Sequence, residues 1–589
     1  MNRILLRGLG VVSMLAVWGC DKSLDIQNPN EPDNQRLLAD PVAVEAVAGG
    51  SMRTWFNAWT PLRGATTMNA QARTHSASWN NGNMRFYTSM YTATGAGWPP
   101  NDTGTSPLLW TRNGASWQNN PSAAARTSID ALWGGGLDES GTSRPGMYAV
   151  LSAANDALKV IRRTAAPIVI NDAAQTKRAE TVAQLMQGAG LMAIALTFDK
   201  GYYVDENSDL TTLAYISRKA MRDSAISKLN AAYTMATANT FTTPASWANG
   251  VSYTNVQIAK IAKTMVAMTL AYYARDNTEA AAVDWTAVAA AAALGMSSGA
   301  ATVDFTFVGD GCAAWCHEQG NWMSSMDTGR LSTRVAYLLD PAGQKDPYPL
   351  TGNPRPNSAD KRLGDGSFGD ASLVAGFGTT PKTAAGGTDF AWSSDAIFRP
   401  DRGYYHQSNI AWIRWDVSGV QSPTGVYGAY GTNTVVNAAL NDLLWAEAAL
   451  RLGGAANITL AVGKINNSRV TRGGLAAAAA GDALGAPADG PCTSAGFLAK
   501  DNTTCTVWSK LLYENEIELL GLGPVPFFNQ RHLPNVQSTG FTGTKARFIQ
   551  GLIPGTPREM PVPYKELAVK GEALYTWGGT GTANSVTPP

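Results

Sequence analysis

The sequence YAVLSAANDALKVI at residues 148–161 predicts an amphipathic α-helix and is the clearest indication of the fold class. Its apolar residues recur at steps of three and four, which is the spacing of one face of a helix. They are Tyr148, Leu151, Ala154, Leu158 and Ile161. Because such a face must be buried, this helix needs neighbouring elements to cover it.

The same helical spacing recurs along the chain. It predicts long helices at residues 179–198, 256–274 and 435–452, and further helices at 221–237, 285–293, 459–470 and 507–520. We expect Gly453-Gly454 to end the helix at 435–452. Alanine is frequent in these segments, and small side chains let helices approach closely. The sequence therefore predicts a mainly α-helical fold of packed helical pairs, although no strict repeat of about 34 residues is visible.

Residues 1–19 have the pattern of a lipoprotein signal peptide. Arg3 and Arg7 give a positive start, and the apolar run that follows is shorter than the roughly 20 residues of a membrane-spanning helix. We expect cleavage before Cys20 and attachment of lipid to its sulfur. Trp18 is bulkier than the small residue usual at this place, so an ordinary signal peptide cleaved elsewhere remains the alternative.

Residues 20–34 are polar and rich in asparagine and proline, which predicts an extended tether. Residues 35–589 would then form the folded domain. Its length exceeds the roughly 250 to 300 residues at which single cores stop growing, so subdomains or one large helical unit are both open.

Composition favours an uncharged ligand. Charged residues make up 15% of the chain, and loss of Arg3 and Arg7 with the signal leaves 44 basic against 45 acidic residues. A nearly neutral protein gives no support to a nucleic-acid partner. A polar, weakly charged surface with aromatic and amide groups suits neutral ligands such as sugars. About two thirds of the 18 tryptophans are expected in the core.

Three long segments rich in Gly, Ser, Thr, Asn and Pro separate the predicted helices. They are residues 80–146, 298–401 and 473–504. Each is too long for a plain connector. The first two contain many tryptophans, which disordered segments lack, so we expect them to be ordered, irregular insertions that bind the ligand.

The ligand site is predicted where flat rings alternate with amides, because rings stack on sugar faces while amides bind hydroxyls. The candidates in the first insertion are Trp79, Asn80, Asn81, Tyr87, Tyr91 and Trp98, and the second choice is Trp315 with Trp322. The alternative is that these rings pack the insertions and touch no ligand.

Four cysteines follow the predicted lipid site, and an even number in an exported chain favours disulfides. Proximity favours Cys312 with Cys316 and Cys492 with Cys505, while the other two pairings remain open. Cys312 to His317 is also one residue longer than the C-x-x-C-H pattern of haem attachment, which makes haem a rival to a small disulfide loop.

The sequence offers little chemistry. It contains no H-E-x-x-H helix, phosphate loop, dinucleotide fingerprint or G-x-S-x-G elbow. We therefore predict no catalytic residue, no metal ligand and no cofactor. Asp360 begins a partial cation loop, but Lys361 and Arg362 oppose a cation, so a turn is expected. Two carboxylates need to meet only in space to cleave a glycoside, so a surface-anchored glycoside hydrolase or another secreted hydrolase stays as the alternative function.

Two acidic residues fall on apolar helices. Glu447 and Glu518 need buried partners there, and Arg531 is a candidate partner for Glu518. We expect these residues to fix the packing rather than to contact a ligand.

Several separated stretches resemble, in the same order, the SusD/RagB family of outer-membrane nutrient-binding lipoproteins. They are Leu24 to Asn30 after the lipid cysteine, the helix with Ala154-Asn155, Leu443 to Ala448, Lys464 to Arg469, Gly473 to Leu475, Glu514 to Leu519, Phe527 to Arg531, and Pro561 to Leu567. The chain departs from the family pattern at Asn515, at Asn529 and at Pro524-Val525-Pro526. These departures concern local ion pairs.

The resemblance implies a body of helical pairs related to tetratricopeptide repeats, with the ligand held by loops between helices. It further implies a partner, a SusC-type TonB-dependent transporter. The protein would sit on the outer membrane through its lipid anchor, facing the cell exterior. There it would capture an oligosaccharide or other nutrient and pass it on without breaking bonds.

Overall fold

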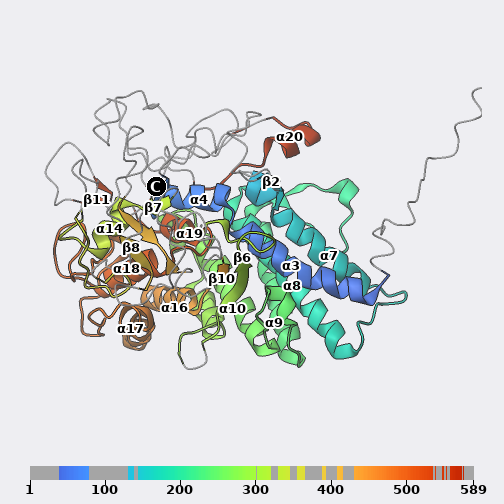
Figure 1. Cartoon of the computed structure of the whole chain (residues 1–589), viewed down its shortest axis with the longest axis horizontal. Coiled ribbons are helices and arrows are strands. Elements are labelled where there is room, and N and C mark those ends of the chain that lie inside the picture. Colours follow the sequence, from blue (N-terminus) through green and yellow to red (C-terminus); the bar gives the residue numbers. More distant parts are fainter. Residues whose placement is uncertain are drawn as a thin grey trace, which may run out of the picture.

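Figure 1 shows the computed structural model of the chain. The described residues are 39–77, 130–137, 143–299, 302–319, 329–344, 354–364, 388–392, 408–414, 430–534, 537–538, 547–548, 552, 558–573 and 575.

Helices dominate the described part of the chain. They are α3 (Pro41–Trp59), α4 (Leu62–Gln71), α7 (Met147–Ile161), α8 (Ala173–Thr197), α9 (Arg218–Ala238), α10 (Asn255–Tyr272), α11 (Asn277–Ala281), α12 (Trp285–Ala293), α14 (Thr333–Leu339), α16 (Ala438–Leu452), α17 (Ala455–Arg469), α18 (Val507–Glu518), α19 (Val525–Arg531) and α20 (Tyr564–Lys570). None of the described helices combines the length and apolar character needed to cross a membrane.

Consecutive helices pack against one another as pairs. Helix α8 contacts both α7 and α9, α10 contacts α9 and α12, and α16 contacts α12, α17 and α18. Helices α3, α7, α8 and α9 form one end of the molecule, and α17 and α18 lie at the other (Figure 1). The structure thus confirms the predicted fold class, a mainly α-helical body of stacked helical pairs.

Small residues bring the central helices close together. From Ala179 to Thr197 every residue of α8 is buried, because α8 is covered on several sides. A Cβ atom at Gly188 would lie 2.7 Å from Cγ of Leu229 on α9. Helix α9 therefore approaches α8 closely only because position 188 has no side chain.

Six antiparallel strand pairs decorate this body in the described residues. They are β1 (His75–Ala77) with β7 (Gly329–Leu331), β2 (Gly135–Leu137) with β3 (Ser143–Pro145), β4 (Lys200–Tyr202) with β5 (Tyr215–Ser217), β6 (Phe305–Asp310) with β10 (Tyr430–Val436), β8 (Phe390–Trp392) with β9 (Ile410–Trp412), and β11 (Gln537–Ser538) with β12 (Arg547–Phe548). In the pair β6 and β10 the register runs from Tyr430 opposite Asp310 to Val436 opposite Phe305, with a bulge between Thr434 and Val436.

The helix predicted at 435–452 begins too early. Val435 and Val436 belong to strand β10, and α16 starts at Ala438. Asn437 is the N-cap, since its side-chain oxygen accepts the N–H of Leu440 at 2.8 Å. Two β-branched residues before a capping asparagine are the signal that the periodicity alone concealed. The helix ends at Gly453 as expected, with φ of 70°.

Most described tryptophans lie in the core. Those that are buried are Trp55, Trp59, Trp133, Trp247, Trp285, Trp315, Trp412 and Trp508. Trp133, from the first predicted insertion, packs edge-on to Phe198 at 4.9 Å between ring centroids. This residue therefore fastens the end of its insertion to the helical body.

Candidate functional site

The structure describes one of the eight candidate ligand residues, Trp315. The remaining candidates Trp79, Asn80, Asn81, Tyr87, Tyr91, Trp98 and Trp322 lie outside the described residues, as does Cys20, the predicted lipid site. Those assignments stay predictions. Trp315 lines a pocket of about 560 Å³ between α3, α8 and the turn Ala245–Ala248, which we call the aromatic pocket.

The floor of the aromatic pocket is one face of α3. Asp40 caps this helix, because its carboxylate accepts the N–H of Val42 at 3.0 Å. The large apolar residues of α3 turn into the core. A second face lines the pocket at steps of three and four residues with Val42, Glu45, Ala46, Gly49, Gly50 and Arg53. The small residues in the middle of this row leave the space that the pocket occupies.

Trp247 forms one wall. A Cβ atom at Gly49 would lie 2.4 Å from Nε1 of Trp247, so the indole can rest on α3 only where the helix lacks a side chain. Arg178 of α8 holds the other side of the ring, with its guanidinium carbon 5.5 Å from the ring centroid. The same guanidinium forms an ion pair with Glu45 and donates to the carbonyl of Thr242 at 3.3 Å.

Trp315 also lines the pocket, on the loop closed by the disulfide Cys312–Cys316. The carboxylate of Asp310 accepts the N–H of Trp315 at 3.0 Å. Asn57 of α3 donates to the carbonyl of Ala314 at 3.0 Å and accepts the N–H of Cys316 at 2.9 Å. These bonds fasten the disulfide loop to the helix that also supplies the pocket floor.

Several hydrogen-bonding groups of the aromatic pocket have no protein partner within the described part of the chain. They are the indole N–H groups of Trp247 and Trp315 and the guanidinium of Arg53, whose side chain is exposed. Each tryptophan is less than 10% exposed, 7% for Trp247 and 8% for Trp315. The pocket therefore offers ring edges, fixed donors and one free cation rather than a broad stacking platform.

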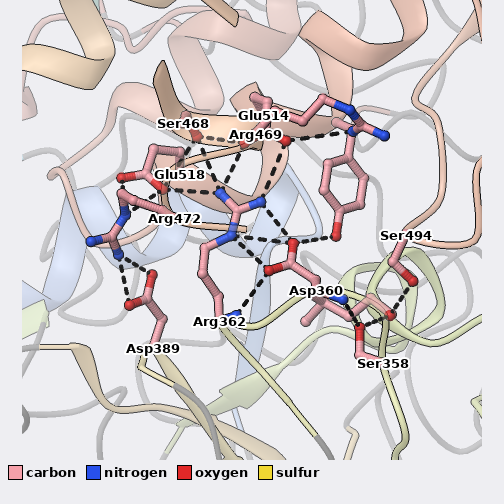
Figure 2. A network of polar contacts seen from close by, with 12 residues as sticks. Ser358, Asp360, Arg362, Asp389, Ser468, Arg469, Arg472, Ser494, Glu514 and Glu518 are labelled. Carbon is pink, nitrogen blue, oxygen red and sulfur yellow. Dashed lines mark hydrogen bonds and ion pairs between the residues drawn. The ribbon is translucent and has the colours of Figure 1, made fainter. Parts of the chain in front are cut away.

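A buried cluster of charges lies around α17 and α18, as Figure 2 shows. At its centre Arg362, fully buried, pairs with Asp360 at 2.7 Å, with Glu514 at 2.9 Å and with Glu518 at 3.0 Å. The cluster balances four arginines against four carboxylates, namely Arg362, Arg414, Arg469 and Arg472 with Asp360, Asp389, Glu514 and Glu518. We call it the charge network.

The charge network sets the ionisation of Glu518. Burial alone would keep this carboxyl protonated, but the charges of Arg414, Arg472 and Arg362 outweigh burial and hold its pKa well below the usual range. Arg472 donates through Nε to Glu518 at 3.0 Å and through Nη2 to Asp389 at 2.7 Å. Both oxygens of Glu518 are thus occupied by arginine N–H groups.

The predicted pairing of Glu518 with Arg531 is wrong. Arg531 donates instead to backbone carbonyls, those of Arg558 at 2.8 Å and Tyr272 at 2.7 Å. The arginines that reach Glu518 come from loops and from the residues after α17, which helical spacing could not place. The expectation that acids on apolar helices have buried partners is confirmed also at Glu447, which His532 contacts at 2.9 Å.

Three residues of the charge network, Arg414, Arg472 and Glu518, also line a second cavity of about 610 Å³, which we call the polar pocket. It lies among the strand pair β6 and β10, the start of α16 and the end of α17. Asp304, Arg414, Arg472 and Glu518 are its charged residues, and threonine, serine and asparagine supply much of the remaining lining. None of its described lining residues is aromatic.

Both favoured disulfides are present, Cys312–Cys316 and Cys492–Cys505. The rival haem assignment is excluded, because the sulfurs of Cys312 and Cys316 are bonded to each other. His317 is fully buried, and burial lowers its pKa to about 4. Asp360, the first residue of the partial cation loop, binds Arg362 within the charge network, and residues 361–364 form the expected turn.

Sequence reasoning missed most of the aromatic pocket. Helix α3 was not predicted, and Trp247, Arg178 and Arg53 were not singled out. The available signal was the row of small residues at helical spacing that includes Ala46, Gly49 and Gly50, directly after the capping pair Asp40-Pro41. Nothing in the sequence places Trp247 or Arg178 beside that row, because both lie more than a hundred residues further along the chain.

No protein-family model matches the chain, and no curated protein matches it. Solved structures do. A SusD superfamily protein from Parabacteroides distasonis ATCC 8503 superposes with a TM-score of 0.53 at 11% identity, covering 92% of this chain and 99% of that chain. A SusD-like protein from Bacteroides fragilis NCTC 9343 gives 0.52 at 11% identity, covering 91% and 97%. Over nine tenths of its length, this chain therefore has the fold of the SusD superfamily.

Proposed function

We propose that the protein is a non-catalytic binding protein that captures a nutrient at the cell surface. The nutrient is an oligosaccharide, which the protein delivers to a SusC-type TonB-dependent outer-membrane transporter. A lipid on Cys20 holds the protein on the outer membrane. The sequence blocks that resemble the SusD/RagB family and the SusD fold support this role together.

The aromatic pocket is the observation that carries the proposal. It combines two indole edges with the free cation of Arg53 and with N–H donors that have no protein partner in the described part of the chain. Clefts with an apolar wall and a few convergent polar groups are typical ligand sites. A sugar presents both apolar C–H faces and hydroxyl acceptors, so it matches this combination.

A substitution that fills the aromatic pocket without disturbing the fold tests the proposal. A Cβ atom at Gly50 would meet nothing within 4 Å, so Gly50→Leu places its side chain in open pocket space. Gly463, in the interior of α17, is equally open and serves as the matched control, Gly463→Leu. We expect Gly50→Leu to weaken oligosaccharide binding by about tenfold or more, or about 1.4 kcal/mol, and Gly463→Leu to leave it unchanged.

The measurement is binding to a glycan and peptide array, followed by calorimetric titration of the best binder. If no glycan binds the wild-type chain while a peptide does, the oligosaccharide assignment is wrong. If glycans bind equally to Gly50→Leu but are lost in Trp79→Ala or Trp98→Ala, the ligand sits on the first insertion instead. The binding function would then stand with a different site.

The hydrolase alternative has one observation to test, since Asp304 and Glu518 line the same cavity. A glycosidase needs one carboxylate free to attack or to activate water. Arginine N–H groups occupy both oxygens of Glu518, and its side chain is 2% exposed, which favours binding over cleavage. Release of shortened glycans in excess of protein during incubation with the array ligands would overturn the non-catalytic role.

The anchor and the partner need separate tests. Mass spectrometry of the mature amino terminus should find diacylglyceryl on Cys20, and Cys20→Ala should release the protein from membranes. A transporter encoded beside this chain should co-purify with it. An unmodified terminus, or a neighbouring gene and membrane partner of another class, would count against these parts of the proposal.

A further inference from the structure

The polar pocket is a cavity of about 610 Å³ built from elements distant in the sequence. Its threonine wall comes from the strand pair β6 and β10, where the hydroxyls of Thr306 and Thr434 lie 3.0 Å apart across the strands. Asp304, just before β6, accepts the N–H of Ala438 at 2.7 Å and so ties this wall to the start of α16.

Several groups of the lining still have hydrogen-bonding capacity. Asp304 uses one carboxylate oxygen for Ala438, and its other oxygen has no partner among the described residues. Asn467 donates to Asp442 at 2.8 Å, which fixes the amide and leaves its carbonyl oxygen as a free acceptor. Thr471, exposed at the end of α17, has a hydroxyl without a protein partner in the described part of the chain.

Arg472 adds a donor whose position is fixed. Its Nε and Nη2 atoms are held by Glu518 and Asp389, as Figure 2 shows, while Nη1 has no partner among the residues described. The side chain is 37% exposed, so it remains accessible from the cavity. A guanidinium held on one side can donate to a ligand with little further loss of conformational entropy.

The charges of the lining cancel. Asp304 and Glu518 balance Arg414 and Arg472, and both arginines already pair with carboxylates. An anionic ligand would therefore find no unpaired cation among the described residues to repay its desolvation. The free oxygen of Asp304 lies close to the charges of Arg414 and Arg472, which disfavour a cationic ligand there. A sugar hydroxyl both donates and accepts, which matches the free acceptors of Asp304 and Asn467, the free N–H of Arg472 and the hydroxyl of Thr471 in the described lining.

We propose that the polar pocket is a second binding site, which takes a neutral, hydroxyl-rich ligand of one or two sugar rings. Its volume lies within the range of small-molecule sites, roughly 300 to 1,000 Å³. Because the lining residues that the structure describes are polar or small and none is aromatic, recognition rests on hydrogen bonds rather than on stacking. Such a site rejects analogues that lack a hydroxyl, since polar groups that the ligand covers would be left unpaired.

The experiment uses the Gly50→Leu chain, in which the aromatic pocket is filled. Glucose, galactose, mannose and their disaccharides are titrated while binding is followed by saturation-transfer NMR. We expect at least one of these sugars to bind the Gly50→Leu chain. Adding Asp304→Asn should weaken its affinity by about tenfold, and adding Thr471→Val instead should also weaken it. Asp304→Asn retains an oxygen for the N–H of Ala438 but replaces the free acceptor with a donor.

Asp156→Asn, on the exposed face of α7, is the matched control and should change nothing. Thermal unfolding checks that each variant is folded. The second site is disproved if no sugar binds the Gly50→Leu chain, or if folded Asp304→Asn and Thr471→Val chains bind as well as the control. If the wild-type chain binds sugars and the Gly50→Leu chain binds none, the second site is ruled out while the proposed function stands. Absence of sugar binding to the wild-type chain would contradict both.

Discussion

The aromatic pocket and the polar pocket have similar volumes, about 560 and 610 Å³, yet different interactions shape them. The aromatic pocket exists because α3 lacks a side chain where Trp247 rests, and its described lining includes one ion pair, Glu45 with Arg178. The polar pocket takes part of its lining, Arg414, Arg472 and Glu518, from the charge network, in which ion pairs hold these side chains.

The difference predicts how each pocket responds to mutation. A pocket shaped by packing should be sensitive to volume and insensitive to charge. A pocket positioned by buried ion pairs should be sensitive to the loss of one charge, because the remaining partners stay buried without compensation. Matched substitutions in the two pockets separate these cases.

The largest effect is expected from the same substitution at two glutamates. Glu518→Gln leaves Arg362, Arg414 and Arg472 with one carboxylate fewer, and should lower the free energy of unfolding by about 3–5 kcal/mol, because Arg362 and Arg414 are buried. Glu45→Gln removes one partly exposed pair, with side chains 18% exposed for Glu45 and 14% for Arg178, and should cost less, about 1–2 kcal/mol, because Arg178 keeps the carbonyl of Thr242. Urea unfolding at neutral pH measures both.

The pH dependence of stability is the control for this pair of variants. The arginines hold the pKa of Glu518 far below its ordinary 4.5 in the folded chain, so its contribution is complete above pH 4.5 and is lost as the pH falls. Glutamine does not titrate. The gap in stability between wild type and Glu518→Gln should therefore narrow on acidification. Equal costs for the two variants at neutral pH would contradict the contrast between the pockets.

The next effect concerns adjacent glycines of α3. Gly49→Ala forces a methyl group to within 2.4 Å of Trp247 and should cost about 1–3 kcal/mol through overpacking. Gly50→Ala meets no atom within 4 Å and should stabilise the helix by about 0.5–1 kcal/mol, since alanine is the better helix former. Thermal unfolding of the two variants measures the difference, and equal stability would show that Trp247 does not depend on Gly49.

Sequence periodicity predicted helices well where one face is apolar and the ends carry a signal. Helix α12 has the predicted bounds of 285–293, and α7 starts one residue earlier than expected. Periodicity failed at Val435 and Val436, because these apolar β-branched residues continue the helical spacing although they belong to a strand. Pro526, which departs from the family pattern, lies in the first turn of α19, where its missing N–H costs no helical hydrogen bond.

The sites were harder to predict, because tertiary contacts that no local pattern encodes assemble them. Trp315 was predicted from its place in an aromatic insertion, but its neighbours Arg178 and Trp247 come from other elements. Glu518 was correctly expected to need a buried partner, whereas the choice of Arg531 was wrong because nearness in sequence says little about nearness in a stack of helices. The need of a buried charge for a partner can be predicted from the sequence, whereas the identity of that partner depends on the fold.

The smallest effect tests the polar pocket from within. Burial raises the pKa of Asp304, against the opposing N–H of Ala438 and the charge of Arg414, so ionisation of Asp304 costs the folded chain free energy. Below the ordinary pKa of 3.8 this cost is absent, and it grows as the pH rises towards the folded pKa. Asp304→Asn removes the titration, so its melting temperature should rise relative to wild type from pH 3 to pH 7. Glu518→Gln should move in the opposite direction over the same range. If the relative melting temperatures of both variants changed in the same direction, one electrostatic effect would control both carboxyl groups. Changes in opposite directions mean that burial dominates at Asp304 and arginine contacts dominate at Glu518, although both line one cavity.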